Sequence, residues 1–208
     1  WEEALEALTS PGAPFAIVDG EAHGQPVKCF ENAPLTLRAL FDGARARADE
    51  VFLVYVVERW TFGEVMARVD GIAALLVGRY GVEPGDRVAI ALRNYPEWIC
   101  TFAAVTSVGA IAVCMNAWWT PDEVQYGLED SGPRVLVADH ERAERAESVL
   151  PSGVRGVLVR GGDAATPKGF ERLEEVLTPG ASMPAVEVDP HDDATILYTS
   201  GTTGHPKG

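Results

Sequence analysis

Positive charge is scarce in this sequence. Lysine and arginine together number 17, whereas aspartate and glutamate number 31, and the formal net charge is -14 at pH 7. Because non-specific nucleic-acid binding needs a basic face that neutralises phosphates, this composition counts against that class of protein. A small anionic ligand stays compatible with the charge, since clustered backbone amides create a local positive site even in an acidic protein. The lysines are Lys28, Lys168 and Lys207.

Cysteine is also scarce, and its spacing excludes the common uses of paired thiols. Cys29, Cys100 and Cys114 are odd in number and form no Cys-x-x-Cys or other metal-binding spacing. We therefore predict free, buried thiols in a reducing compartment, with a catalytic cysteine as the alternative. No basic segment followed by an apolar one opens the chain, so we predict no signal peptide and a cytoplasmic location. Because residue 1 is Trp1 and not methionine, we expect the natural N-terminus to be missing or processed.

Charged residues are absent from one long stretch, 98–121, with the sequence WICTFAAVTSVGAIAVCMNAWWTP. Its length would suffice to cross a bilayer. Pro96 and Glu97 suit a helix start, however, and Gly109 suits a helix end, after which IAVCM has the character of a short apolar strand. We therefore predict a buried helix followed by a buried parallel strand, with a membrane span as the alternative.

Apolar strands alternate with helical segments along most of the chain. Thr61 with Glu64, and Thr120 with Glu123, have the spacing of capping boxes that begin helices. Short apolar runs such as VFLVYVV, VLVAD, VRGVLVR and ATILYTS are typical of strands covered on both faces, whereas FERLEEVL favours a short helix. The alternation predicts an α/β fold, doubly wound, with a mostly parallel sheet and helices on both faces.

Two parts of unequal size are predicted. Residues 1–34 form an N-terminal extension in which EEALEAL is helical and FAIVDGEAHGQPVKCF makes two strands around a glycine-containing turn. Residues 35–208 form the first part of a large α/β domain that ends in a loop rich in glycine and threonine.

That terminal loop, YTSGTTGHPKG, has the composition of a phosphate receptor. It follows an apolar strand, and ligands of open α/β sheets gather at the carboxyl ends of strands. Its glycines let several backbone N–H groups point at one object, its hydroxyls add donors, and its lysine adds a positive charge. The candidate phosphate-binding residues are Thr199, Ser200, Gly201, Thr202, Thr203, Gly204 and Lys207.

Two other interpretations of this loop are a P-loop and a polar turn. It is not a P-loop of the GxxxxGK[ST] type, because Pro206 stands where the second glycine belongs and Gly208 follows the lysine in place of serine or threonine. A polar turn that binds nothing is the second alternative. The tripeptide PKG also occurs at 167–169 in a plain surface loop, so only the complete run of strand, hydroxyls, glycines and lysine is informative.

The loop and the blocks that precede it resemble one enzyme family. YTSGTTGHPKG resembles the phosphate-binding signature of the AMP-forming acyl-CoA synthetases, and every position from Ile196 to Lys207 fits it. The blocks RWTFGEVMARVDGIAALL, GVEPGDRVAIALRNYPEW and SVGAIAVCMNAWWTPDEVQYGLEDSGPRVLVAD precede it in the family's order. The resemblance spans about residues 35–208, and residues 1–34 resemble mainly the fatty-acyl branch.

The resemblance implies a two-step ligase. A carboxylic acid, with a fatty acid expected, attacks ATP to give acyl-AMP and pyrophosphate, and coenzyme A then displaces AMP. Amides around Gly201 and Gly204, together with Lys207, would stabilise charge on the departing pyrophosphate. By similarity to the family, the hydroxyl of Thr199 is a candidate partner for Mg²⁺. An aryl-acid ligase or an acyl-AMP ligase of the same superfamily is the alternative.

Several family segments have no counterpart before Gly208. These are the adenine- and ribose-binding segments, the magnesium glutamate, the hinge and the small C-terminal domain with its catalytic lysine. We therefore expect an N-terminal fragment that is inactive alone, whose open sheet edge exposes apolar surface and favours pairing, including a homodimer. A truncated binding or dimerisation module without catalysis is the competing interpretation. Peripheral membrane contact is compatible with either.

His205 and two aspartates near the loop are expected to have minor roles. His205 occupies a variable position of the loop and is expected to face solvent or make a minor phosphate contact. Asp192 and Asp193 are expected in a solvated turn before the last strand, with metal binding as the alternative.

Two tryptophans and two asparagines are also candidates for structural or site-lining roles. Trp118 and Trp119 are expected to be core or subdomain-contact aromatics, with an acyl channel as the alternative. Asn94 and Asn116, at strand ends, fit either a turn or a site lining.

Overall fold

A six-stranded parallel sheet forms the centre of the protein. The computed structural model describes residues 1–199, 207 and 208. Every neighbouring pair of strands is parallel. In spatial order the strands are β10 (Thr195–Leu197), β6 (Ile111–Cys114), β5 (Arg87–Ala91), β7 (Val135–Asp139), β8 (Arg155–Val159) and β9 (Phe170–Arg172).

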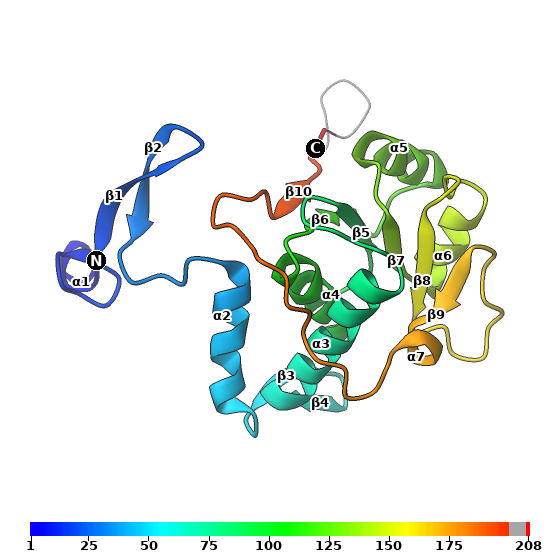
Figure 1. Ribbon diagram of the computed structural model, residues 1–208, viewed down its shortest axis with the longest axis horizontal. Helices are drawn as coiled ribbons and strands as arrows, with labels where there is room; N and C mark the ends of the chain where they lie inside the picture. The colour runs from blue at the N-terminus through cyan, green and yellow to red at the C-terminus, as the bar shows by residue number, and fades with distance from the viewer. Residues whose placement is uncertain (200–206) are drawn as a thin grey trace.

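Helices cover both faces of this sheet, as predicted (Figure 1). Strand β5 shows how the strand period creates two cores, since Val88 and Ile90 face one helical layer and Ala89 and Ala91 face the other. The first layer consists of α3 (Phe62–Gly78) and α4 (Pro96–Ser107), and the second of α5 (Pro121–Ser131) and α6 (His140–Glu147). The apolar runs therefore lie in a doubly covered sheet, which explains why they do not alternate with polar residues.

Both predicted capping boxes are confirmed. At the start of α3 the Glu64 amide donates to Thr61 Oγ1 at 3.2 Å, and the Thr61 amide donates to Glu64 Oε2 at 2.8 Å. Thr120 and Glu123 make the same pair of bonds at the start of α5. Each box satisfies two amides that the helix itself leaves without acceptors.

The charge-free stretch forms a helix and a strand inside the protein. It contains most of α4, which is 12 residues long, and then the buried strand β6. Gly109 has φ +70° and ends the helix, and an added Cβ there would lie 3.2 Å from Pro84. Within the described residues, no helix is both long and apolar enough to cross a membrane.

Two local predictions were only partly right. The run VFLVYVV forms a strand, β3 (Val51–Tyr55), as predicted, but β3 does not join the parallel sheet and pairs antiparallel with β4 (Glu58–Thr61) as a separate hairpin beside α3. The segment predicted as one helix opens with β9, and α7 is short (Leu173–Val176). Phe170 packs where a Cβ on Gly156 would lie 2.5 Å from its ring, so pairing with β8 overrides local helix propensity.

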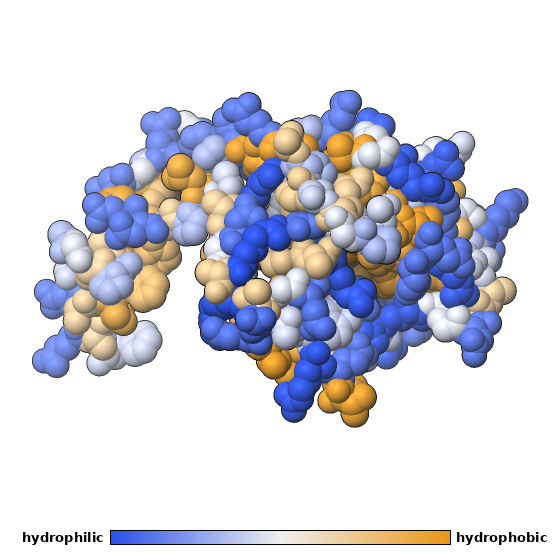
Figure 2. Space-filling view, turned by 60° about the horizontal axis from the view of Figure 1, so that its bottom comes forward, coloured by the Kyte–Doolittle hydropathy of each residue, from blue (hydrophilic) through white to orange (hydrophobic). Residues whose placement is uncertain are grey.

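The N-terminal arm extends away from the sheet (Figure 1). It contains α1 (Glu2–Thr9) and the antiparallel hairpin of β1 (Ile17–Ala22) and β2 (Gln25–Phe30), as predicted, and leads into α2 (Leu37–Gly43) and a 3-10 turn (Ala44–Arg47). Within residues 1–34, Ala16 is the single buried residue, and Figure 2 shows apolar side chains on the visible surface of the arm. The boundary between residues 34 and 35 stays a prediction.

The prediction of three buried thiols was wrong for Cys29. That residue lies on the exposed hairpin, whereas Cys100 is fully buried in α4 and Cys114 is half-buried in β6. Burial raises the pKa of the Cys100 thiol to about 12, and burial also raises the pKa of Cys114. Because the thiolate is the reacting form, burial and a raised pKa both make Cys100 slow to react with alkylating reagents.

We expect one fast-reacting thiol in the folded chain. At pH 8 iodoacetamide should label Cys29 rapidly, Cys114 slowly and Cys100 only after unfolding in guanidinium, as read by peptide mass spectrometry. A Cys29→Ser variant that lost none of the fast labelling would contradict this order.

Gly127 on α5 provides space for Trp119. A Cβ at Gly127 would lie 2.5 Å from Trp119 Cζ3 and 3.1 Å from Met115 Cε. Gly127→Ala should therefore lower the free energy of unfolding by about 1–3 kcal/mol through overpacking. The matched control is Gly78→Ala in the last turn of α3, where an added Cβ meets nothing and should stabilise by about 0.5–1 kcal/mol. Urea titrations of both variants test this, and equal shifts would contradict it.

Candidate functional site

Several candidate residues lie at one end of the sheet because the strands are parallel and in register. Leu197 of β10 lies opposite Cys114 of β6, which lies opposite Ile90 of β5. The segments that follow these strands therefore meet at the same end, where ligands of open α/β sheets bind. Figure 1 shows the chain leaving β10 close to α5.

The two ends of the glycine- and threonine-rich loop are joined to each other. The Thr199 amide donates to the Lys207 carbonyl at 2.8 Å, and the Lys207 amide donates to the Thr199 carbonyl at 3.0 Å. These two amides are thus engaged, so the predicted phosphate contacts of Thr199 and Lys207 depend on the hydroxyl and the ammonium of their side chains. Both residues are exposed. The other candidates, Ser200, Gly201, Thr202, Thr203, Gly204 and His205, lie outside the described residues.

Tyr198 anchors the Thr199–Lys207 pair, which is the closed base of the loop, to helix α5. Its hydroxyl donates to Asp130 Oδ2 at 2.6 Å, and its ring lies edge-on to Trp119 with centroids 5.3 Å apart. Partial burial, followed by the hydrogen bond with Asp130, raises the pKa of Tyr198. The sequence-based prediction missed both Tyr198 and Asp130. Period-two alternation places Ile196 and Tyr198 on one face of the strand, but no local pattern could have indicated Asp130 as the acceptor.

Two cavities open at the same end of the sheet. One of about 340 Å³ lies between β3 and the start of α4, and the other, of about 280 Å³, lies beside the segments after β5 and β6. Asn94 lines both cavities, which favours its site-lining role. The Oδ1 atom of Asn116 instead accepts a hydrogen bond from the Trp118 amide at 3.0 Å, so Asn116 is a turn residue.

The adjacent tryptophans have different environments. Trp119 is buried in the core between the sheet and α5, as predicted. Trp118 is 72% exposed, lines the smaller cavity and lies 5.1 Å below the guanidinium of Arg93. Trp118 is therefore not a core residue within this chain, because the turn at Asn116 directs its side chain outwards, and its predicted role as a subdomain contact stays a prediction.

Arg160 fixes the wall of these cavities. Its guanidinium lies about 5 Å from the ring centroids of both Tyr55 and Tyr95, and it pairs with Glu58 at 2.8 Å and Glu97 at 2.8 Å. The hydrogen bond from Arg160 lowers the pKa of Glu58. The β3–β4 hairpin is thereby attached to the start of α4, which gives the cavity a defined shape.

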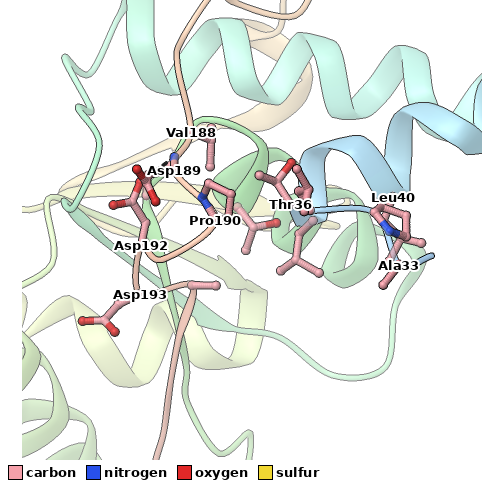
Figure 3. A pocket seen from close by; sticks show the side chains of 15 residues that line it. Ala33, Thr36, Leu40, Val188, Asp189, Pro190, Asp192 and Asp193 are labelled. Atoms are coloured by element: carbon pink, nitrogen blue, oxygen red, sulfur yellow. Dashed lines mark hydrogen bonds between the residues drawn. The ribbon is translucent and has the colours of Figure 1, made fainter. Parts of the chain in front are cut away.

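A pocket of about 400 Å³ lies at the opposite end of the sheet (Figure 3). It precedes β6 and β10 and is lined by Asp189, Asp192 and Asp193, with Pro190 and Leu40 among its apolar residues. Asp192 accepts a hydrogen bond from the Asp189 amide at 3.0 Å, in the solvated turn that was predicted. Three carboxylates at the amino ends of the strands make this pocket unsuitable for a polyphosphate.

Thr199 is the residue predicted to contact Mg²⁺. The Thr199 hydroxyl is exposed and donates weakly to the Lys207 carbonyl at 3.4 Å, so it fits as a single protein ligand. Among residues 1–199, 207 and 208, no group of three or more His, Cys, Asp or Glu side chains could hold a metal ion. The role of Thr199 toward Mg²⁺ stays a prediction.

Known proteins resemble this chain over most of its length. It is 36% identical over 155 residues to the long-chain-fatty-acid–CoA ligase FadD13 of Mycobacterium tuberculosis, which covers 72% of this chain and 29% of that protein. It is also 36% identical over 151 residues to 4-coumarate–CoA ligase 3 of Oryza sativa, covering 73% and 26%. The crystal structure of the anthranilate CoA ligase AuaEII with anthranoyl-AMP superposes with a TM-score of 0.74 at 27% identity, covering 84% and 34%.

The chain matches only part of the length of these related proteins. This chain spans about a quarter to a third of each of the three proteins. The family model described as AMP-binding enzyme matches residues 40–208, which include the whole parallel sheet and both ends of the candidate loop. The chain therefore belongs to the AMP-binding enzyme family.

Proposed function

We propose that this chain supplies the polyphosphate-binding part of an ATP-dependent acid–thiol ligase. The observation that carries the proposal is the closed base of the loop, where Thr199 and Lys207 pair at the carboxyl end of the parallel sheet. This pairing holds the backbones of a residue with a hydroxyl and a residue with an ammonium opposite each other. The resemblance to a ligase solved with anthranoyl-AMP supports an acyl-adenylate as the intermediate.

The first step is an in-line displacement. A carboxylate oxygen attacks the α-phosphorus of ATP, and the bond from that phosphorus to its bridging oxygen breaks. Pyrophosphate leaves with the electron pair, so negative charge grows on the group nearest the loop. Lys207 and the hydroxyl of Thr199 would stabilise that charge in place, because they are held before the reaction begins. The sulfur of coenzyme A then attacks the acyl carbon and displaces AMP.

A fatty acid is the substrate class that we propose. FadD13, a long-chain-fatty-acid ligase, matches 72% of this chain at 36% identity. The aromatic cavity lined by Tyr55, Tyr95 and Trp98 would accept part of an apolar acid. Aryl acids form the second candidate class, since 4-coumarate–CoA ligase 3 matches with the same identity. We also propose a cytoplasmic location and a homodimer.

Pyrophosphate release from the full-length gene product tests the proposal. The protein is incubated with MgATP and a panel of fatty and aryl acids, with and without coenzyme A. We expect acid-dependent pyrophosphate release and, once coenzyme A is added, the acyl-CoA thioester, with fatty acids preferred. The 208-residue chain alone should show no turnover. Nucleotide binding without turnover in the full-length product would instead favour the binding-module interpretation.

A further inference from the structure

We propose that Tyr198 and Asp130 are positioning residues that hold the base of the polyphosphate loop against α5. This inference rests on the proposed function and extends it, because it assigns the reaction a dependence on two residues that need not touch ATP. It comes from the contacts of Tyr198 with both ends of the loop.

Tyr198 contacts the chain on each side of the loop. It directly precedes Thr199 at the first end. At the second end, a Cβ added to Gly208 would lie 2.8 Å from Tyr198 Cζ and 3.0 Å from Ile196 Cγ2, so Gly208 packs directly against the ring. The Thr199–Lys207 pair lies between these two contacts. A shift of the Tyr198 ring would therefore move both Thr199 and Lys207.

Helix α5 and the tryptophan packed on it hold the Tyr198 side chain in position. Trp119 is buried against α5, where Gly127 leaves the space for its ring, and it meets the Tyr198 ring edge-on at 5.3 Å. The Tyr198 hydroxyl donates to Asp130 at 2.6 Å. A hydrogen bond to an ionised carboxylate is short and strong, so it fixes the ring's orientation as well as its distance.

The location of Asp130 indicates that this bond is not simply a helix-stabilising device. Asp130 lies in the last turn of α5, which contains no basic residue, and a carboxylate there opposes the helix dipole. The Tyr198 hydroxyl donates to this carboxylate. An acidic residue that is unfavourable for its own helix thus gains a stabilising contact from the strand that leads into the loop.

The chain offers a matched control at the opposite edge of the sheet. The hydroxyl of Tyr80 donates to Glu171 Oε2 at 3.0 Å, and Glu171 belongs to β9, whereas Tyr198 follows β10. Tyr80→Phe and Tyr198→Phe each remove one hydroxyl that donates to a carboxylate, and each bond involves a residue in or next to an edge strand. A general loss of stability would affect both variants, but only Tyr198→Phe should raise the KM for ATP.

The test measures steady-state pyrophosphate release by the full-length gene product. We expect Tyr198→Phe and Asp130→Ala to raise the KM for ATP about tenfold, which corresponds to one charge-assisted hydrogen bond, with little change in the KM for the acid. Asp130→Asn keeps an acceptor oxygen and should restore most of the wild-type KM. Tyr80→Phe should keep the wild-type KM for ATP.

The outcomes separate this inference from the proposed function. A wild-type protein without acid-dependent pyrophosphate release would contradict the proposed function, whatever the variants do. An active wild type with an unchanged KM for ATP in Tyr198→Phe would overturn the positioning role alone. A fall in kcat at constant KM that equals the loss of folded protein measured by circular dichroism would also overturn it, because that result reports only a smaller folded fraction. So would a KM raised equally by Tyr80→Phe.

Discussion

Replacing Lys207 by alanine is expected to slow adenylation by about 10²–10³-fold, the size of effect seen when one preorganised donor is removed from a developing negative charge. Lys207 is exposed beside Thr199 and is joined to it through two backbone hydrogen bonds. The substitution removes the ammonium but leaves the backbone pairing intact. The measurement is acid-dependent pyrophosphate release by the full-length gene product under saturating MgATP.

The sequence contains its own control for this experiment. Lys168 occupies the same tripeptide, Pro-Lys-Gly, in an exposed loop before β9. Lys168→Ala removes an identical side chain from the same local sequence and should leave the rate unchanged. An unchanged rate in Lys207→Ala, or equal losses in the two variants, would remove Lys207 from its assigned role.

Replacing Asp139 by alanine should lower the free energy of unfolding by about 3–5 kcal/mol, because it removes the buried carboxylate that pairs with Arg142, caps α6 and accepts from the Arg93 amide, and leaves Arg142 with the more exposed Glu141. Asp139 is 3% exposed at the end of β7, and its Oδ1 accepts bonds from the amide and from Nη1 of Arg142, both at 3.2 Å. Its Oδ2 accepts a bond from the Arg93 amide at 3.0 Å. One carboxylate thus caps α6, pairs a buried guanidinium and joins β7 to the segment after β5.

Two further variants separate the parts of this effect. Asp139→Asn keeps an oxygen for the cap but loses the charge, so it should cost less than alanine. Asp19→Ala breaks an exposed ion pair with Lys28 on the N-terminal hairpin and should change the unfolding free energy little. Urea titration followed by circular dichroism gives all three values. Similar losses in Asp139→Ala and Asp19→Ala would contradict the buried-pair explanation.

Much of the fold could be predicted because its signals are local. The pairs Thr61 with Glu64 and Thr120 with Glu123 begin the helices that they predicted. Gly109 ends the helix before β6, so the charge-free stretch was correctly divided. A capping box or a helix-ending glycine acts over a few residues, and the same few residues are visible in the sequence.

Predictions failed where a distant partner decided the structure. The segment at Phe170 begins as a strand because it pairs with β8 and packs over Gly156. The β3–β4 hairpin was missed because ERWT lacks a strand pattern of its own. Trp118 and Trp119 are neighbours in sequence, yet the turn at Asn116 exposes one and buries the other. Contacts of this kind have no signature within a single segment.

The sequence by itself determined the chemistry of the candidate site, because the residue types of TSGTTG and Lys207 fix which groups can meet a phosphate. It also determined the family, since those residues follow the other blocks in a specific order. Only the tertiary structure decided that Tyr198 joins both ends of the loop to Asp130 and Trp119. The physical reason is distance along the chain: Asp130 and Tyr198 lie 68 residues apart and meet only because parallel strands bring α5 to the edge of β10.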